Sequence, residues 1–120
     1  MSSYELRAGE YLVQNPSNTE RNCLESRSRG IKLVLQQDGN LVLSVVHNGR
    51  VLWSSGTGGK AVSKAIMQDD GNFVIYGFGG SALWSSDTFG KSGSYLIVQD
   101  DGNLVIYQPV AQWSTDTVGK

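Results

Sequence analysis

Residues 96–109 read LIVQDDGNLVIYQP, and the same pattern occurs twice earlier, as LVLQQDGNLVLSVV at 33–46 and AIMQDDGNFVIYGF at 65–78. Each stretch carries an Asp-Gly pair between runs of apolar residues. An Asp-Gly pair in this setting is a strong signal for a β-hairpin, because glycine adopts the positive φ of a tight turn without strain. The three stretches therefore predict three hairpins, and no window of the chain shows a convincing helical period.

The hairpin stretches belong to a repeat of about thirty residues. Their glutamines, Gln36, Gln68 and Gln99, are 32 and 31 residues apart. A tryptophan among small polar residues follows each stretch, at Trp53, Trp84 and Trp113. A unit of this size cannot bury its apolar face alone, so the three units must pack together. One tryptophan per unit is expected to fill the centre, where each ring buries on the order of 200 Å².

The chain is expected to form a single all-β domain over residues 1–120. The repeats occupy approximately 31–60, 61–92 and 93–120, after a lead-in at 1–30 with its own strand candidate at Glu10–Gln14. Each repeat is predicted to form a small antiparallel sheet of three or four strands. The domain should therefore have three similar sheets around one core.

The hairpins have one polar and one apolar face, because residues two apart share a face of a strand. The apolar face, which belongs in the core, carries Leu41, Leu43, Phe73, Ile75, Leu104 and Ile106. The polar residues are the candidate binding residues. Since the Asp-Gly step can bend the chain, strict alternation is not assumed through it, and the Gln-Asp and Asn-Val-Tyr arms are expected on facing or contiguous strands. The candidate residues are Gln36, Asp38, Asn40, Val42 and Ser44 in the first copy, Gln68, Asp70, Asn72, Val74 and Tyr76 in the second, and Gln99, Asp101, Asn103, Val105 and Tyr107 in the third.

The polar face has the chemistry of a sugar-binding surface. Asparagine and glutamine amides donate and accept hydrogen bonds, aspartate accepts them, and the tyrosine hydroxyl does either. This set matches the vicinal hydroxyls of a pyranose, and valine offers a smooth contact for its C–H face. Asp, Gly and Asn are also ordinary turn residues. A turn alone, however, requires neither the glutamine two residues before Asp nor the tyrosine four residues after Asn.

The motif Gln-x-Asp-x-Asn-x-Val-x-Tyr in three tandem copies, over essentially the whole chain, resembles that of the monocot mannose-binding, or bulb-type, lectins. The resemblance implies the β-prism II fold, with three four-stranded antiparallel sheets around a pseudo-threefold axis and a tryptophan-lined core. It also implies calcium-independent binding of terminal α-mannose. In that family Asp and Asn bind the axial O2, Gln binds O3, Tyr binds O4 and Val lies against the ring carbons.

These implied roles fall on the complete second and third copies, whereas the first copy has Ser44 in the tyrosine position. A serine hydroxyl should not reach the sugar atom that the phenol serves, so the first site is expected to be weakened or silent. The family commonly forms dimers, often by exchanging C-terminal strands, here residues 108–117. The expected partners are therefore mannose-containing glycans or glycoproteins and a second copy of the chain.

Plant members of that family usually have a signal peptide and one intrachain disulfide. This chain has a single cysteine, Cys23, and its start, MSSYELRAGEYL, lacks a positively charged segment followed by an apolar one. It is therefore identified as a leaderless, disulfide-free relative, expected in the cytoplasm or secreted without a signal peptide. Cys23 is expected to be a plain buried or loop thiol.

Composition excludes other classes of protein. The formal net charge of −1 argues against a nucleic-acid-binding module, whose affinity depends on neutralising phosphates. No apolar run of about 18 residues is present, so no membrane insertion is expected. One cysteine and one histidine, His47, leave no disulfide framework or zinc finger and little basis for a histidine-based metal or catalytic site. Glycine, at 15 of 120 residues, exceeds the average usage of about 7%, as many tight turns require.

Two other functions compete with sugar binding. A glycoside hydrolase needs two carboxylates with separated pKa values across a cleft, whereas Asp69–Asp70 and Asp100–Asp101 are chain neighbours that point to opposite faces of a strand. A calcium loop would end in a glutamate that these stretches lack. No catalytic residue, metal or cofactor is therefore expected. The main alternative is a protein–protein interaction or inhibitor module on the same fold, with little sugar binding.

Overall fold

A computed structural model describes residues 2–109, and these form eleven strands and no helix. The strands are β1 (Glu5–Leu6), β2 (Tyr11–Leu12), β3 (Cys23–Glu25), β4 (Ile31–Leu35), β5 (Leu41–Val45), β6 (Val51–Ser54), β7 (Val62–Met67), β8 (Phe73–Gly77), β9 (Ala82–Ser85), β10 (Tyr95–Val98) and β11 (Leu104–Tyr107). Because the described part of the chain has no helix, it also has no helix long and apolar enough to cross a membrane.

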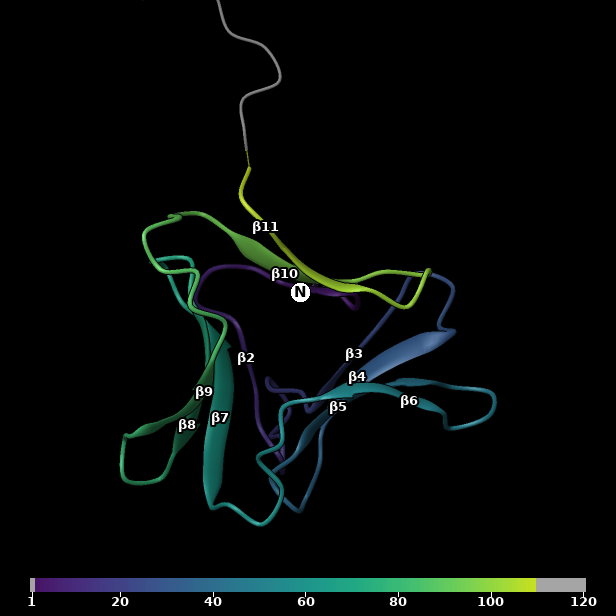
Figure 1. The fold of residues 1–120 in the computed structure, drawn as a ribbon, viewed down its shortest axis with the longest axis horizontal. Helices are drawn as coiled ribbons and strands as arrows, with labels where there is room; N and C mark the ends of the chain where they lie inside the picture. The colour runs from purple at the N-terminus through teal and green to yellow at the C-terminus, as the bar shows by residue number, and fades with distance from the viewer. Residues whose placement is uncertain (1, 110–120) are drawn as a thin grey trace, which may run out of the picture.

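The strands form three antiparallel sheets that make the three sides of a triangle (Figure 1). Their strand orders are β1-β10-β11, β2-β7-β8-β9 and β3-β4-β5-β6, here called sheets A, B and C. The arrangement confirms the all-β, three-sheet architecture predicted from the sequence. The fourth strand expected for sheet A falls on residues 110–120, which lie outside the described residues.

The lead-in gives one short strand to each sheet. Strand β1 pairs with β10, β2 with β7, and β3 with β4. The strand predicted at Glu10–Gln14 is found, but it is shorter, as β2. Strands β1 and β3 were not predicted, because two or three residues are too few to show an alternating pattern. The single cysteine lies on β3 as a free, partly buried thiol, and burial is the main reason why the pKa of Cys23 is raised.

The core lies between the three sheets. Leu41, Leu43, Phe73 and Ile75 are at most 2% exposed, as predicted from their face of the hairpins. Leu104 and Ile106 on β11 are only partly buried, although they pack against the same core. The reason is that β11 is the edge of sheet A within the described chain, so that no neighbouring strand covers it there.

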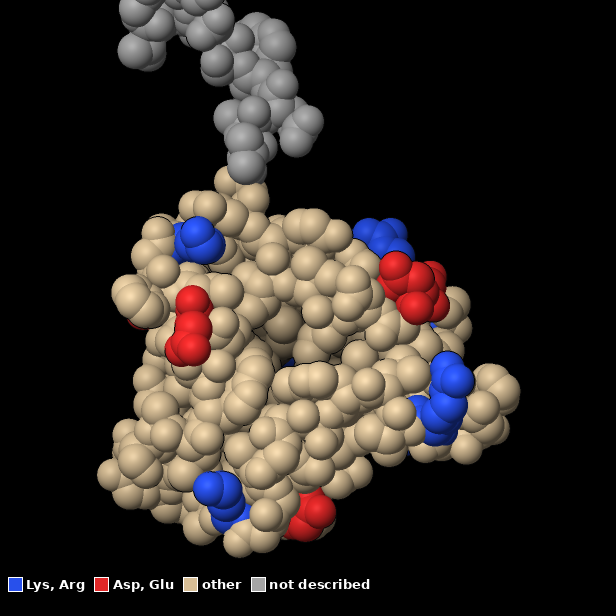
Figure 2. Space-filling model, viewed as in Figure 1, with Lys and Arg blue, Asp and Glu red and all other residues tan. Residues whose placement is uncertain are grey.

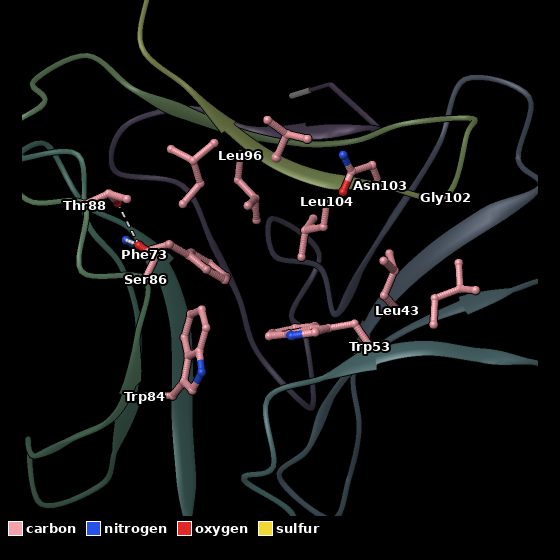
Figure 3. A pocket seen from close by; sticks show the side chains of 13 residues that line it. Leu43, Trp53, Phe73, Trp84, Ser86, Thr88, Leu96, Gly102, Asn103 and Leu104 are labelled. Carbon is pink, nitrogen blue, oxygen red and sulfur yellow. Dashed lines mark hydrogen bonds between the residues drawn. The ribbon is translucent and has the colours of Figure 1, made fainter.

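A hollow of about 640 Å³ opens at the centre of the triangle. Trp53 and Trp84 line it and meet edge to face, with ring centroids 5.5 Å apart (Figure 3). Both rings are partly buried and pack against the core. The two tryptophans therefore line the centre, as predicted, but do not fill it. The third predicted ring, Trp113, lies outside the described residues. Around the hollow, acidic and basic side chains are spread along the rim of this face and form no single charged patch (Figure 2).

Candidate functional site

Each copy of the motif forms the turn of a hairpin on the outside of one sheet. In the second copy the Gln68 N–H donates to the Asn72 carbonyl oxygen at 2.9 Å, and the Gly71 N–H donates to the Gln68 carbonyl oxygen at 3.1 Å. Gly71 has a φ of +91°, as the Asp-Gly signal predicted. The first and third copies repeat these two bonds at 2.9 and 3.0 Å. The sequence therefore produces three turns with the same backbone.

The aspartate of each turn has one oxygen committed and one available. Asp70 Oδ1 accepts from the Asn72 N–H at 2.9 Å, and the same bond has the same length in the other two copies. The Asp70 and Asp101 side chains make no other hydrogen bond with described residues. Both residues are exposed, so their free carboxylate oxygen can accept from a ligand hydroxyl.

The asparagine amide is oriented by the segment that follows each tryptophan. Asn72 Oδ1 accepts from Ser86 Oγ at 3.1 Å and from the Thr88 N–H at 3.2 Å. Thr88 Oγ1 in turn donates to the Gly71 carbonyl oxygen at 2.5 Å and lies 2.7 Å from Ser86 Oγ (Figure 3). Because the amide oxygen is occupied, the Asn72 Nδ2 group is left to donate to a ligand. Acceptor and donor thus stand side by side in one turn.

Sequence reasoning missed these supporting residues. In the first copy Ser55 and Thr57 hold Asn40 Oδ1 in the same way, at 3.2 Å each. The signal that could have identified them is the small polar stretch that follows each tryptophan. The corresponding stretch of the third copy, residues 114–117, lies outside the described residues.

Thr88 is expected to position Asn72 for binding. Thr88→Val keeps the side-chain shape but removes the hydroxyl, leaving the Gly71 carbonyl oxygen without that bond. We expect the second site to lose several-fold in affinity for methyl α-mannoside, because one net hydrogen bond is worth about 1 kcal/mol. Titration calorimetry in an Asp101→Ala background, where the third copy is silenced, measures this loss. Thr88→Ser should restore binding, and equal losses in both variants would contradict a role for the hydroxyl.

Glutamine and tyrosine close the other end of the motif. Gln68 Nε2 donates to Tyr76 Oη at 2.5 Å, and Gln99 Nε2 donates to Tyr107 Oη at 2.8 Å. The phenol hydrogen therefore remains free for a ligand. The valine between them, Val74 in the second copy, lies on the same outer face and is 2% exposed. The second copy thus brings together all five of its candidate residues. In the third copy Gln99, Asp101 and Tyr107 make the same contacts, whereas Asn103 and Val105 also line the central hollow.

The first copy has the same turn but a different end. Ser44 takes the tyrosine position, faces Lys32 across the β4–β5 pair, and is 7% exposed. A pocket of about 250 Å³ lies above it, where the other copies carry a phenol.

The adjacent carboxylates do not act as pairs. Asp100 Oδ1 accepts from the Ser28 N–H at 2.9 Å and from Ser28 Oγ at 2.7 Å, and these bonds hold the pKa of Asp100 below its ordinary value. Asp101 instead serves the turn of the motif. Asp100 therefore ties sheet A to the lead-in, and it shares no partner with its neighbour. Within residues 2–109, no group of three or more His, Cys, Asp or Glu side chains could hold a metal ion.

The chain resembles several solved lectin structures. A monomeric monocot mannose-binding lectin from Gastrodia elata is 38% identical, with 95% of this chain and 97% of that chain covered and a TM-score of 0.71. The mannose-specific agglutinin of snowdrop (Galanthus nivalis), solved with methyl-α-D-mannoside, is 34% identical, with 95% and 96% covered and a TM-score of 0.74.

Comparisons by sequence alone reach less far. No protein-family model matches the chain. Comitin from Dictyostelium discoideum is 43% identical over 60 residues, a match that spans 46% of this chain and only 30% of comitin.

Three antiparallel sheets around a pseudo-threefold axis, with a polar turn motif on the outside of each sheet, define the β-prism II fold of the mannose-binding lectins. The coverage and identity of the solved structures extend this from the fold to the family. The chain belongs to the bulb-type, or monocot mannose-binding, lectin family.

Proposed function

We propose that this protein is a calcium-independent lectin that binds terminal α-mannose of glycans and glycoproteins and performs no catalysis. The observation that carries the proposal is the paired geometry of the second and third copies. In each, a free aspartate oxygen stands beside the motif asparagine, and a glutamine is hydrogen-bonded to the motif tyrosine. Mannose complexes among the solved relatives support this choice of sugar.

The turn supports recognition of an axial hydroxyl. One hydroxyl placed between the Asp70 carboxylate and the Asn72 amide donates to the first and accepts from the second. In mannose that hydroxyl would be the axial O2, with Gln68 on O3 and Tyr76 on O4, as the family resemblance implies. A sugar with an equatorial O2 lacks these two hydrogen bonds, and because Asp70 is exposed, each lost bond is expected to cost only about 1 kcal/mol.

Affinity is expected to come from several weak sites. A shallow site on a sheet face with a few hydrogen bonds should bind with a Kd around the millimolar range, about −4 kcal/mol. Two competent sites per chain could together gain roughly 10²- to 10⁴-fold on a branched glycan whose geometry permits simultaneous binding. The first copy is expected to add little with a single mannose, because Ser44 replaces the phenol.

We also propose that the protein forms a homodimer by exchanging residues 108–117. The link between β11 and the last tryptophan supports exchange, since only five residues separate Tyr107 from Trp113, against seven between Tyr76 and Trp84. The β8–β9 hairpin turns at Gly80, with a φ of +85°, whereas residues 108–112 contain Pro109 and no glycine. A short connection that disfavours a tight turn favours exchange of the following strand with another copy.

Titration of the wild-type protein with methyl α-mannoside tests the proposal. We expect two equivalent sites per chain, unchanged by excess EDTA, and a mass in solution of two chains by light scattering. Three equivalent sites would contradict the interpretation of Ser44, and loss of binding with EDTA would contradict calcium independence. Release of reducing sugar from mannan would overturn the assignment as a non-enzyme.

A further inference from the structure

The pocket in the first copy lies on the outer face of sheet C, between strands β4, β5 and β6. It occupies the end of the motif that a phenol fills in the other two copies. In those copies the tyrosine accepts a hydrogen bond from the motif glutamine, so that ring and amide together close the site. In the first copy nothing equivalent closes it, and the site continues into a pocket of about 250 Å³.

The floor of the pocket carries the Ser44 hydroxyl. The residue is 7% exposed and lines the pocket, and its Oγ makes no hydrogen bond with the described residues. The Ser44 oxygen is not among the buried polar atoms that lack a partner, so it faces the open space of the pocket, where a ligand hydroxyl can replace water as its partner. Ser44 is therefore more than a shortened tyrosine, because it presents a donor and an acceptor inside a recess.

Two further polar groups border the same space. The Gln36 side-chain amide, which has no tyrosine to bind, makes no hydrogen bond with residues 2–109, and the Lys32 ammonium forms no ion pair with them. In the second copy the corresponding Lys64 instead lies over the Tyr11 ring, 5.6 Å from its centroid. The Gln36 amide and the Lys32 ammonium are thus available to a ligand, whereas their counterparts in the second copy contact tyrosine side chains of the same chain.

The surroundings favour a neutral, hydroxyl-rich ligand over an anion. Glu25 on β3 is the cross-strand neighbour of Lys32, so that an acidic residue adjoins the lysine although the two side chains form no ion pair. The remaining lining side chains are apolar: Val34, Val42 and Val51, of which Val51 is 60% exposed. Hydroxyl groups match the polar members of this set, and the C–H face of a pyranose suits the valines.

We infer that the first copy is an extended site for a mannoside whose recognised mannose carries a second sugar residue, which occupies the Ser44 pocket. The inference rests on the proposed function, since Asp38 and Asn40 would hold the first residue. Their turn is fully built, because Asp38 Oδ1 accepts from the Asn40 N–H at 2.9 Å and Asn40 Oδ1 is held at 3.2 Å by the Thr57 N–H. The first copy therefore recognises oligosaccharides in preference to a single mannose.

The test uses an Asp70→Ala/Asp101→Ala chain, in which only the first copy keeps its motif. Its ligands are methyl α-mannoside and α1,2-, α1,3-, α1,6- and β1,4-linked mannobiose, measured by titration calorimetry. At least one mannobiose should bind about tenfold more tightly than the monosaccharide, because two added hydrogen bonds and an apolar contact are available. Equal affinities would overturn the inference. So would tighter binding of mannose 6-phosphate than of any mannobiose.

Reciprocal variants test whether the Ser44 pocket causes the preference for mannobiose. Adding Ser44→Tyr to the same chain should remove the preference for mannobiose and strengthen binding of methyl α-mannoside. In an Asp38→Ala/Asp101→Ala chain, Tyr76→Ser should weaken binding of the monosaccharide at the second site. An unchanged preference after Ser44→Tyr, in a protein whose circular dichroism shows it folded, would overturn the inference.

The wild-type titration separates the two possible failures. If the wild-type protein binds no mannoside at all, the proposed function has failed. If the second and third copies bind mannose and the first shows no preference for the disaccharide, only the extended site has failed.

Discussion

Replacing Asp70 and Asp101 together by alanine is expected to abolish binding of methyl α-mannoside at the second and third copies, leaving only the weaker first copy, while the protein stays folded. Each carboxylate uses one oxygen to fix its turn and leaves the other for the sugar. A hydrogen bond to a charged group is worth about 1.5–3 kcal/mol, so each site should lose roughly 10- to 150-fold in affinity. Starting from weak sites, such a loss takes binding out of the range of titration calorimetry.

Asp69→Ala is the matched control for the second site. Asp69 is an exposed neighbour of Asp70, and its carboxylate makes no hydrogen bond with described residues, so the substitution removes the same charge without touching the motif. We expect unchanged binding. If the double variant bound mannoside as well as the wild type, the motif would not be the binding site. Retained recognition of a protein partner, with no sugar binding in the wild type, would favour the protein–protein interaction or inhibitor module.

Gly71→Ala is expected to destabilise the domain by about 3 kcal/mol or more, which is large for a single substitution. Gly71 has a φ of +91°, and an added Cβ would lie 2.3 Å from the carbonyl oxygen of Lys91. Because that oxygen belongs to the backbone, the strand connection itself must move. Urea denaturation measures the loss in free energy of unfolding.

Gly80→Ala separates the two causes of that loss. Gly80 has a similar φ of +85°, but nothing lies within 4 Å of an added Cβ. Its substitution should therefore cost only the backbone strain, about 1 kcal/mol. Equal losses for the two variants would show that the contact with Lys91 is not what constrains the motif turn.

The hairpins and their turns could be predicted because their signals are local. Asp-Gly between alternating apolar residues requires a tight turn wherever it occurs, and Gly39, Gly71 and Gly102 all have φ between +90° and +94°. The same alternation assigned Leu41 and Phe73 to the core. Periodicity also identified the polar residues of each repeat as the candidate binding residues, although alternation does not extend through the Asp-Gly turn.

The remaining features depend on contacts between distant segments. Strands β1 and β3 form because they pair with β10 and β4, and a segment of two or three residues has no sequence pattern that predicts such a pairing. Thr88 supports the Gly71 turn across 17 residues of sequence. The sequence shows that Ser44 replaces a tyrosine, but it does not show the pocket above Ser44, because the residues that line the pocket come from three strands.

The lead-in links the three sheets in a way that bears on how the chain folds. Glu5 pairs with Ile97, so that sheet A cannot take up its first strand until the third repeat has been synthesised. In arrays whose repeats contact only their neighbours, folding can begin at any unit and spread along the chain. Here the pairings span long stretches of sequence, and such non-local contacts slow folding. Three repeats that look like independent modules are thus expected to fold as one cooperative unit, after the third has left the ribosome.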